Sequence, residues 1–176
     1  MRRVRYSVAM SLDGYIAGPN GESDWIIMDP DIDFGALFKS FDTVLMGRHT
    51  FEMAASQGGG GGMPGMRAVV FSRTLRASEY PKVTLVSEDA GNAVAALRAQ
   101  PGKDIWLMGG GSLFRSLLDA GQVDAVEVAV IPVLLGGGIP LLPGPGSRAT
   151  LQLAGSKIYD KTGIVMLEYK VQGGAG

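Results

Sequence analysis

Two hydrophobic patterns alternate along the chain. Short apolar runs rich in β-branched residues predict strands, and apolar positions that recur every three or four residues predict helices. The run at Val128–Leu135 is apolar throughout, which is typical of a strand buried on both faces. The runs that predict strands are Val4–Met10, Thr43–Met46, Ala68–Ser72, Val83–Val86, Ile105–Met108, Ala125–Ile131, Lys157–Tyr159 and Ile164–Val171.

Three helices are predicted between these strands from apolar spacing and end signals, and a fourth, short one opens after Gly47. The first follows Asp31 and Asp33, whose carboxylates are favourable at a helix start. The other two are expected at Ser87–Gln100 and from Leu113 to Gly121. Strands that alternate with single helices predict an α/β fold with a mostly parallel sheet covered on both faces. The last two strands, joined by a turn at Asp160–Gly163, predict an antiparallel hairpin.

Composition narrows the class of protein. The chain has 176 residues, which suits one domain, and we expect that domain to cover residues 1–172 with a disordered tail at 173–176. The absence of cysteine excludes disulfides and thiolate catalysis, and the one histidine excludes a multi-histidine centre, so no metal is predicted. A net charge of −1 with scattered basic residues argues against nucleic acid as a partner.

Membrane association is also not expected. Residues 128–146 carry no charge and are long enough to span a bilayer, but their prolines and the triplet Gly136–Gly138 break any helix there. We therefore expect a cytoplasmic protein. The glycine run Gly58–Gly62 is interpreted as a flexible surface loop in preference to a ligand clamp.

Three predicted strands end in residues suited to phosphate. Gly109–Gly111 and Gly47–Thr50 each follow a strand and open a helix, where free backbone N–H groups attract anions. Ser72 and Arg73 follow a third strand, and arginine offers a bidentate fork to phosphate oxygens. Neither a Rossmann fingerprint nor a P-loop is present. Two helix starts at one sheet edge could clasp a pyrophosphate.

Several of these segments resemble the dihydrofolate reductase superfamily. The matching segments are Ser7–Gly18, Ser23–Trp25, Met46–Glu52 and Met108–Leu113. The second half, from Leu117 to Gly138, is similar to the reductase domain of the bifunctional riboflavin-biosynthesis deaminase–reductase. The resemblance implies a single three-layer domain around a largely parallel eight-stranded sheet, an NADPH cofactor in extended form, a small-molecule substrate and a homodimer.

The resemblance also implies where the cofactor and substrate would lie. Trp25, Phe34 and Phe38 would border the substrate. The implied cofactor residues are Ala9, Asp13, Gly14 and Ile16 by the nicotinamide, Gly47, Arg48, His49 and Thr50 at the phosphates, Ser72 and Arg73 at the adenosine, and Gly109, Gly110, Gly111, Ser112 and Leu113 around the pyrophosphate.

The predicted activity is NADPH-dependent hydride transfer to a C=N or C=O bond of a small heterocyclic or sugar-like molecule. The resemblance implies a reaction most like the 5-amino-6-(5-phosphoribosylamino)uracil reductase step of riboflavin biosynthesis. A proton donor is also needed, and Asp24, Asp31 and Asp33 are the candidates. Equally, Asp31 and Asp33 can simply cap a helix, and Asp24 can bind a turn. The helix carboxylate of folate-reducing members has no clean match, because two ways of aligning the helix place either Phe34 or Asp31 there. Folate reduction and a non-catalytic NADPH-binding role therefore stay as alternatives.

Overall fold

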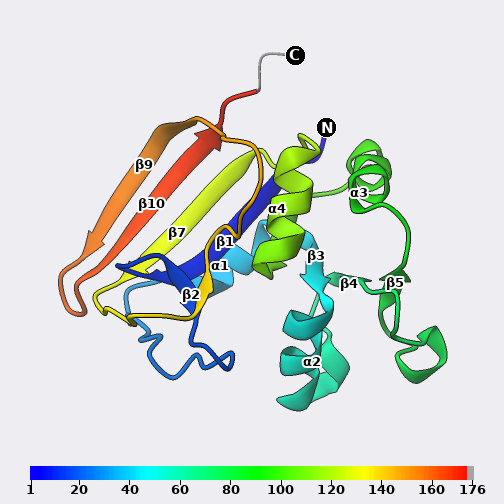
Figure 1. The fold of residues 1–176 in the computed structure, drawn as a ribbon, viewed down its shortest axis with the longest axis horizontal. Helices are drawn as coiled ribbons and strands as arrows, with labels where there is room; N and C mark the ends of the chain where they lie inside the picture. Colours follow the sequence, from blue (N-terminus) through cyan, green and yellow to red (C-terminus); the bar gives the residue numbers. More distant parts are fainter. Residues whose placement is uncertain (174–176) are drawn as a thin grey trace.

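The structure, a computed structural model, describes residues 1–173, so nearly all of the tail expected at 173–176 lies outside the described residues. An eight-stranded sheet runs through the molecule (Figure 1). Its strands are β1 (Val4–Ser11), β3 (Phe41–Gly47), β4 (Arg67–Phe71), β5 (Thr84–Val86), β6 (Asp104–Gly109), β7 (Ala125–Ile131), β9 (Leu151–Tyr159) and β10 (Ile164–Val171).

The strand order is β5-β4-β3-β6-β1-β7-β10-β9. Every neighbouring pair from β5 to β7 is parallel, and β10 pairs antiparallel with both β7 and β9. The sheet is thus largely parallel with a C-terminal antiparallel hairpin, which confirms the predicted fold class. Because the parallel strands point the same way, their carboxyl ends meet along one edge.

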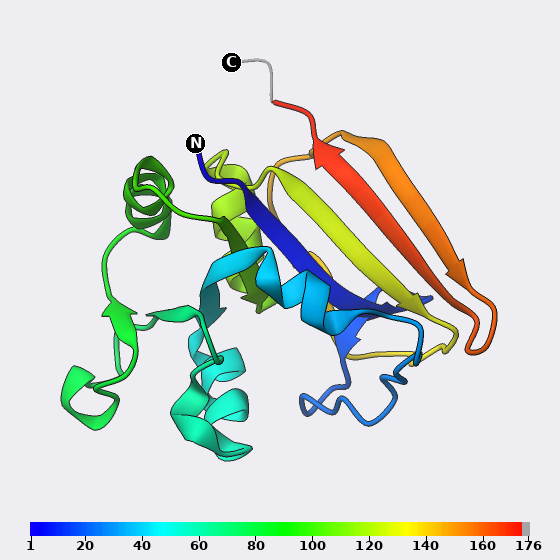
Figure 2. The same cartoon turned by 180° about the vertical axis from the view of Figure 1, so that it is seen from behind.

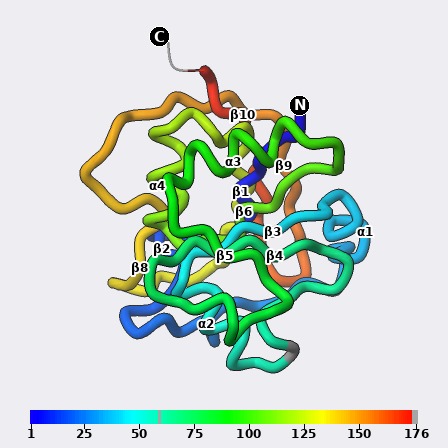
Figure 3. Tube along the Cα trace, turned by 90° about the vertical axis from the view of Figure 1, so that its right-hand side faces the viewer, coloured from blue at the N-terminus to red at the C-terminus, as the bar shows by residue number. Residues whose placement is uncertain are grey.

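Helices cover both faces of the parallel part of the sheet. They are α1 (Phe34–Lys39), α2 (Arg48–Ser56), α3 (Ala90–Ala99) and α4 (Gly111–Asp119), with short 3-10 turns at Gly59–Gly61 and Ala77–Glu79. Figure 1 shows α4 in front of the sheet, and Figure 2, from behind, shows α1 in front of it. Figure 3 looks from the β5 side, with α4 and α1 on opposite sides of the strands.

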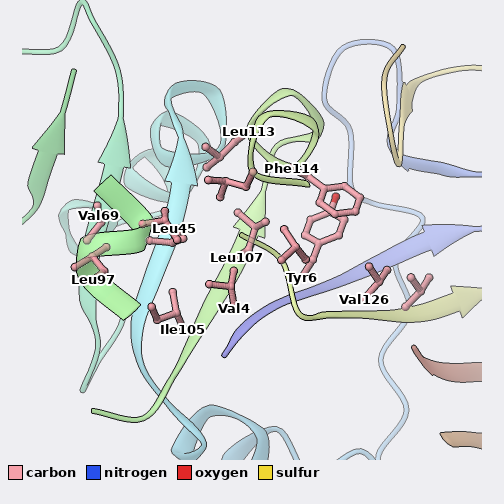
Figure 4. Close-up of a cluster of buried hydrophobic side chains, with 14 residues drawn as sticks. Val4, Tyr6, Leu45, Val69, Leu97, Ile105, Leu107, Leu113, Phe114 and Val126 are labelled. Carbon is pink, nitrogen blue, oxygen red and sulfur yellow. The ribbon is translucent and has the colours of Figure 1, made fainter. Parts of the chain in front are cut away.

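The two faces have separate cores because side chains alternate along each strand. Toward α3 and α4, buried residues of β1, β3 and β6 pack against Leu97, Leu113 and Phe114 (Figure 4). Tyr6 stacks on Phe114, with ring centroids 3.9 Å apart. On the opposite face, Phe51 of α2 is fully buried against β3 and β4.

Three local differences separate the structure from the expectations. The strand expected to continue through Val128–Leu135 ends at Ile131, before Pro132, and Leu134 is 69% exposed. The strand β9 begins at Leu151, well before the predicted Lys157, because an exposed edge strand carries little apolar signal. A second, two-stranded sheet of β2 (Tyr15–Ala17) and β8 (Ile139–Pro140) was not predicted.

The glycine run is packed on one side. Within it Gly61 has a φ of +77°, and a Cβ there would overlap the ring of Phe51. A side chain at Gly61 is therefore excluded by both backbone conformation and space, so Gly61 packs against α2, whereas Gly58, Gly60 and Gly62 are exposed, as expected for a surface loop. None of the helices in residues 1–173 combines the length and the hydropathy required to cross a bilayer.

Candidate active site

A groove of about 970 Å³ runs along the edge where the parallel strands end. The last residues of four strands line it: Gly47 of β3, Phe71 of β4, Val86 of β5 and Gly109 of β6. In sheets of this kind ligands bind outside the carboxyl ends of the strands. The volume lies within the range of ordinary ligand sites.

Two helix starts face each other in the middle of this groove. Gly47 is the N-cap of α2 and Gly110 is the N-cap of α4, and neither helix start is capped by a side chain. A Cβ built on Gly47 would lie 3.6 Å from the Gly110 nitrogen. The first N–H groups of both helices are therefore left for an anionic ligand, beside the positive ends of two helix dipoles.

The predicted residues around these starts come together. His49 and Thr50 line the groove from α2, and the Thr50 hydroxyl oxygen would lie 3.7 Å from a Cβ on Gly109. The remaining predicted members that line the groove here are Gly47, Arg48, Gly109, Gly110, Gly111, Ser112 and Leu113. The whole set predicted to hold phosphates thus shares one groove.

A basic and hydroxyl-rich corner lies toward β4. Arg48 donates from Nε to Glu52 Oε1 at 2.9 Å and from Nη1 to Thr74 Oγ1 at 2.7 Å. Ser72 and Arg73 line the groove beside it. Glu52 and Thr74 hold the Arg48 guanidinium against the turn that follows β4. Guanidinium and hydroxyl groups in one corner suit a phosphate monoester.

His49 is the histidine at the α2 start. Its side chain is 93% exposed, and its Nδ1 lies 3.7 Å from a carboxylate oxygen of Glu52. The exposure of this side chain favours a surface role over that of a catalytic base. Among residues 1–173, no three histidine, cysteine or acidic side chains are grouped as a metal site would need.

The predicted nicotinamide group is only partly assembled. Ile16 lines the groove, whereas Ala9, Asp13 and Gly14 are not among its lining residues. The Asp13 carboxylate accepts the Ser11 hydroxyl at 2.6 Å and the N–H groups of Leu135 and Gly136 at 3.1 and 2.7 Å. The hydrogen bond from Ser11, with help from those amides, lowers the pKa of Asp13. Asp13 therefore ties the loop after β1 to the loop after β7.

The structure places none of the three candidate proton donors on the groove lining. Asp33 caps α1 by accepting from the Ala36 N–H at 2.9 Å. Asp31 pairs with Lys161 Nζ at 2.9 Å on the surface. Asp24 is exposed and points to no side-chain partner among the described residues. For Asp31 and Asp33 the geometry thus favours the helix-start and surface roles, and the proton donor has no carboxylate assigned.

The carboxylate that sequence reasoning missed is Asp29. It is 2% exposed, accepts the Thr162 hydroxyl at 2.6 Å and accepts the Asp31 N–H at 2.8 Å. The bond from Thr162 lowers the pKa of Asp29. Asp29 therefore joins the loop before α1 to the β9–β10 turn. Because Thr162 lies more than a hundred residues away from Asp29 in the sequence, no local pattern indicated this role.

The aromatic residues predicted to border the substrate lie outside the groove. Phe38 packs on Trp106 with ring centroids 5.4 Å apart, and Phe34 packs on Phe38 at 6.1 Å. Trp25 donates from its indole N–H to the Glu22 carbonyl at 2.9 Å. Together they fill space beneath α1 and within the loop before it. Beyond the helix starts, the groove is also lined by residues that were not predicted, including Ser23, Ile26, Met53 and Gln57.

The comparison with known proteins identifies the family to which this chain belongs. Residues 2–165 match the RibD C-terminal domain family, so the chain belongs to that family. The Bacillus subtilis protein YyaP is 33% identical over 98% of this chain and 96% of its own length. The fold is that of the dihydrofolate reductase superfamily, and the protein is a reductase-like enzyme of the RibD family.

Several solved structures share this fold. A Shewanella structure described as a putative riboflavin biosynthesis protein has a TM-score of 0.81 and 28% identity, covering 98% of this chain and 99% of that chain. A Thermotoga maritima deaminase/5-amino-6-(5-phosphoribosylamino)uracil reductase has a TM-score of 0.70 at 19% identity, covering 97% of this chain and 57% of that chain. Enterococcus faecalis dihydrofolate reductase, solved with NADP(H), has a TM-score of 0.72 at 16% identity, covering 97% and 96%.

Proposed function

We propose that the protein is an NADPH-dependent reductase that transfers a hydride to a C=N or C=O bond of a small heterocyclic or sugar-like molecule. One observation carries the proposal: two uncapped helix starts and an arginine–hydroxyl corner lie along a single groove at the carboxyl edge of the sheet. A reaction of this kind is the reductase step on 5-amino-6-(5-phosphoribosylamino)uracil, which the description of the Thermotoga protein names.

The groove fits a dinucleotide at its middle. A side chain at Gly47 would come within contact distance of the Gly110 backbone and fill the space between the helix starts. Glycine at both positions leaves room for a pyrophosphate to approach the N–H groups of Arg48–Thr50 and Gly111–Leu113. These backbone groups are fixed by the helices, so they need no rearrangement to bind an anion.

The corner toward β4 supplies the preference for NADPH over NADH. Arg48, Ser72 and Arg73 offer cationic and hydroxyl donors to the 2′-phosphate that distinguishes the two cofactors. Glu52 holds the Arg48 guanidinium, which reduces the conformational freedom lost on binding. The opposite end of the groove, at Ile16, then faces the nicotinamide, which supplies the hydride.

The test is a titration with NADPH and with NADH, following nicotinamide fluorescence, and then NADPH oxidation with a panel of pterins, pyrimidine ribosides and quinones. We expect NADPH to bind more tightly than NADH and at least one acceptor to be reduced. Failure of both cofactors to bind would refute the proposal.

A second candidate, a non-catalytic NADPH-binding protein, is favoured by one observation: none of the predicted proton donors lines the groove. Tight NADPH binding with no oxidation across the panel would select it. Folate reduction is disfavoured by the same observation, since it calls for a carboxylate beside the substrate.

A further inference from the structure

The groove changes character beyond the two helix starts. Its lining there includes Ile16 and Ile26 together with Met53 of α2. A Cβ on Gly21 would lie 3.5 Å from the Met53 sulfur, so the loop after β2 and α2 meet there. We call this region, lined by Ile16, Ala17, Gly21, Ser23, Ile26, Met53, Ala54 and Gln57, the loop end of the groove.

The loop end is uncharged. Its polar side chains are the hydroxyl of Ser23 and the amide of Gln57, and its other lining residues are apolar or glycine. The charged residues that line the rest of the groove lie at the helix starts and toward β4 and α3: Arg48, His49, Arg73, Glu88 and Asp89. The groove is therefore divided into a polar part and an apolar part.

The hydride acceptor is expected to bind in the loop end, because this region adjoins the position expected for the nicotinamide. If the helix starts bind the pyrophosphate and the corner at Ser72 and Arg73 binds the adenosine end, an extended cofactor directs its nicotinamide toward Ile16. The acceptor has to lie against that ring, since hydride transfer requires contact. The acceptor therefore lies among Ile26, Met53 and their neighbours.

We propose that the hydride acceptor is an uncharged molecule with an apolar face and no phosphate group. This inference rests on the proposed function and specifies the substrate class of the same site. A phosphate dianion in the loop end would meet no cationic side chain among the residues that line it. The guanidinium on α2, Arg48, is held toward the turn after β4 by Glu52 and Thr74, and it is not part of the loop end. Ser23 and Gln57 are left to orient a carbonyl or imine by neutral hydrogen bonds.

The proton balance follows from the same lining. The hydride electron pair forms a C–H bond at the carbon of the C=O or C=N group, and the π electrons pass to the heteroatom. Because no carboxylate belongs to the loop end among the described residues, water supplies the proton that forms O–H or N–H. NADPH is oxidised to NADP⁺ and the acceptor is reduced by two electrons. An uncharged acceptor needs no further group from the protein.

The test compares hydride acceptors with and without a phosphate group. NADPH oxidation is measured with 5-amino-6-ribosylaminouracil and its 5′-phosphate, together with an uncharged naphthoquinone and an aromatic aldehyde. We expect turnover of uncharged acceptors, with kcat/KM at least about tenfold higher for the riboside, or for the quinone or aldehyde, than for the phosphate. Preference for the phosphate overturns the inference.

A charge variant makes the test independent of substrate choice. Gln57→Arg places a cation in the loop end and should raise kcat/KM for the phosphate relative to uncharged acceptors. Ser56→Arg adds the same charge one residue away, off the groove lining, and should leave the ratio unchanged. If both variants change this ratio equally, the acceptor does not bind in the loop end. NADPH binding without turnover of any uncharged acceptor overturns this inference alone, whereas loss of NADPH binding overturns the proposed function.

Discussion

Replacing Gly138 by alanine tests how the loop end is built. Gly138 has a φ of +146°, and a Cβ there would overlap the Ala17 carbonyl oxygen and lie 3.2 Å from the Ala17 carbon. It precedes Ile139, which pairs with Ala17 where β8 meets β2. The substitution must therefore either displace β2 or strain the backbone of the loop after β7.

The change in the free energy of unfolding combines two destabilising effects and one stabilising effect. An unfavourable backbone conformation costs about 1–3 kcal/mol. Forcing an extra methyl into packed atoms costs roughly another 1–3 kcal/mol. Alanine also lowers the conformational entropy of the unfolded chain, which stabilises the folded protein by about 0.4–1 kcal/mol. We expect Gly138→Ala to lower the free energy of unfolding by about 3 kcal/mol, and the melting temperature by roughly 6–12 °C for a chain of this size.

The neighbouring glycine provides the control. A Cβ on Gly137 would meet nothing within 4 Å, and its φ lies outside the left-handed range, so Gly137→Ala should be close to neutral. Urea unfolding followed by circular dichroism measures both variants. In Gly138→Ala, turnover should fall more than NADPH affinity, because Ile16 and Ala17 belong to the loop end. Equal stability of the two variants would refute the packing described for β2 and β8.

Four further predictions follow. Arg48→Ala should weaken NADPH binding about tenfold in a fluorescence titration and leave NADH binding nearly unchanged, because a charge-assisted hydrogen bond contributes about 1.5–3 kcal/mol and this arginine is half exposed. Arg76 does not line the groove, so an equal loss of affinity in Arg76→Ala would contradict the role of Arg48. Asp13→Ala should lower stability at neutral pH and make stability depend less on pH in the acid range. The pKa of Asp13 is lowered in the folded protein, so its contribution to stability is present above the unfolded-state pKa and is lost as the pH falls through the folded-state pKa. An unchanged acid unfolding curve would show that the hydrogen bonds of Asp13 do not stabilise the fold. Tyr6→Phe should raise the free energy of unfolding by about 1 kcal/mol in urea, because the buried hydroxyl has no hydrogen-bond partner among the described residues, and a loss of stability would show that it has one. The homodimer implied by the family resemblance predicts twice the chain mass in sedimentation equilibrium, and a single species at the monomer mass would rule it out.

The parts of the fold and site that could be predicted depend on local signals. Glycine at positions 47, 109 and 110 follows apolar strands and opens helices, and this order alone places the residues at one sheet edge when the strands are parallel. The structure brings these residues together as expected. The hydroxyl and arginine after β4 could be placed by the same logic.

The remainder depends on contacts between distant segments. Asp13 was assigned to the cofactor, but its carboxylate bonds to amides more than a hundred residues later, which no periodicity reveals. Asp31 carries a carboxylate of the right type near the expected loop, yet Lys161 on the β9–β10 turn holds it at the surface. Met53 lies on an ordinary helix, and only the approach of Gly21 makes it part of a binding site.

Amide chemical-shift mapping during a titration with NADP⁺ tests the central arrangement most directly. If one dinucleotide spans both helix starts, the backbone N–H groups of Arg48–Thr50 and Gly111–Leu113 shift together, with the same apparent affinity. Shifts confined to one of the two helix starts, or centred away from both, would contradict the groove as a cofactor site.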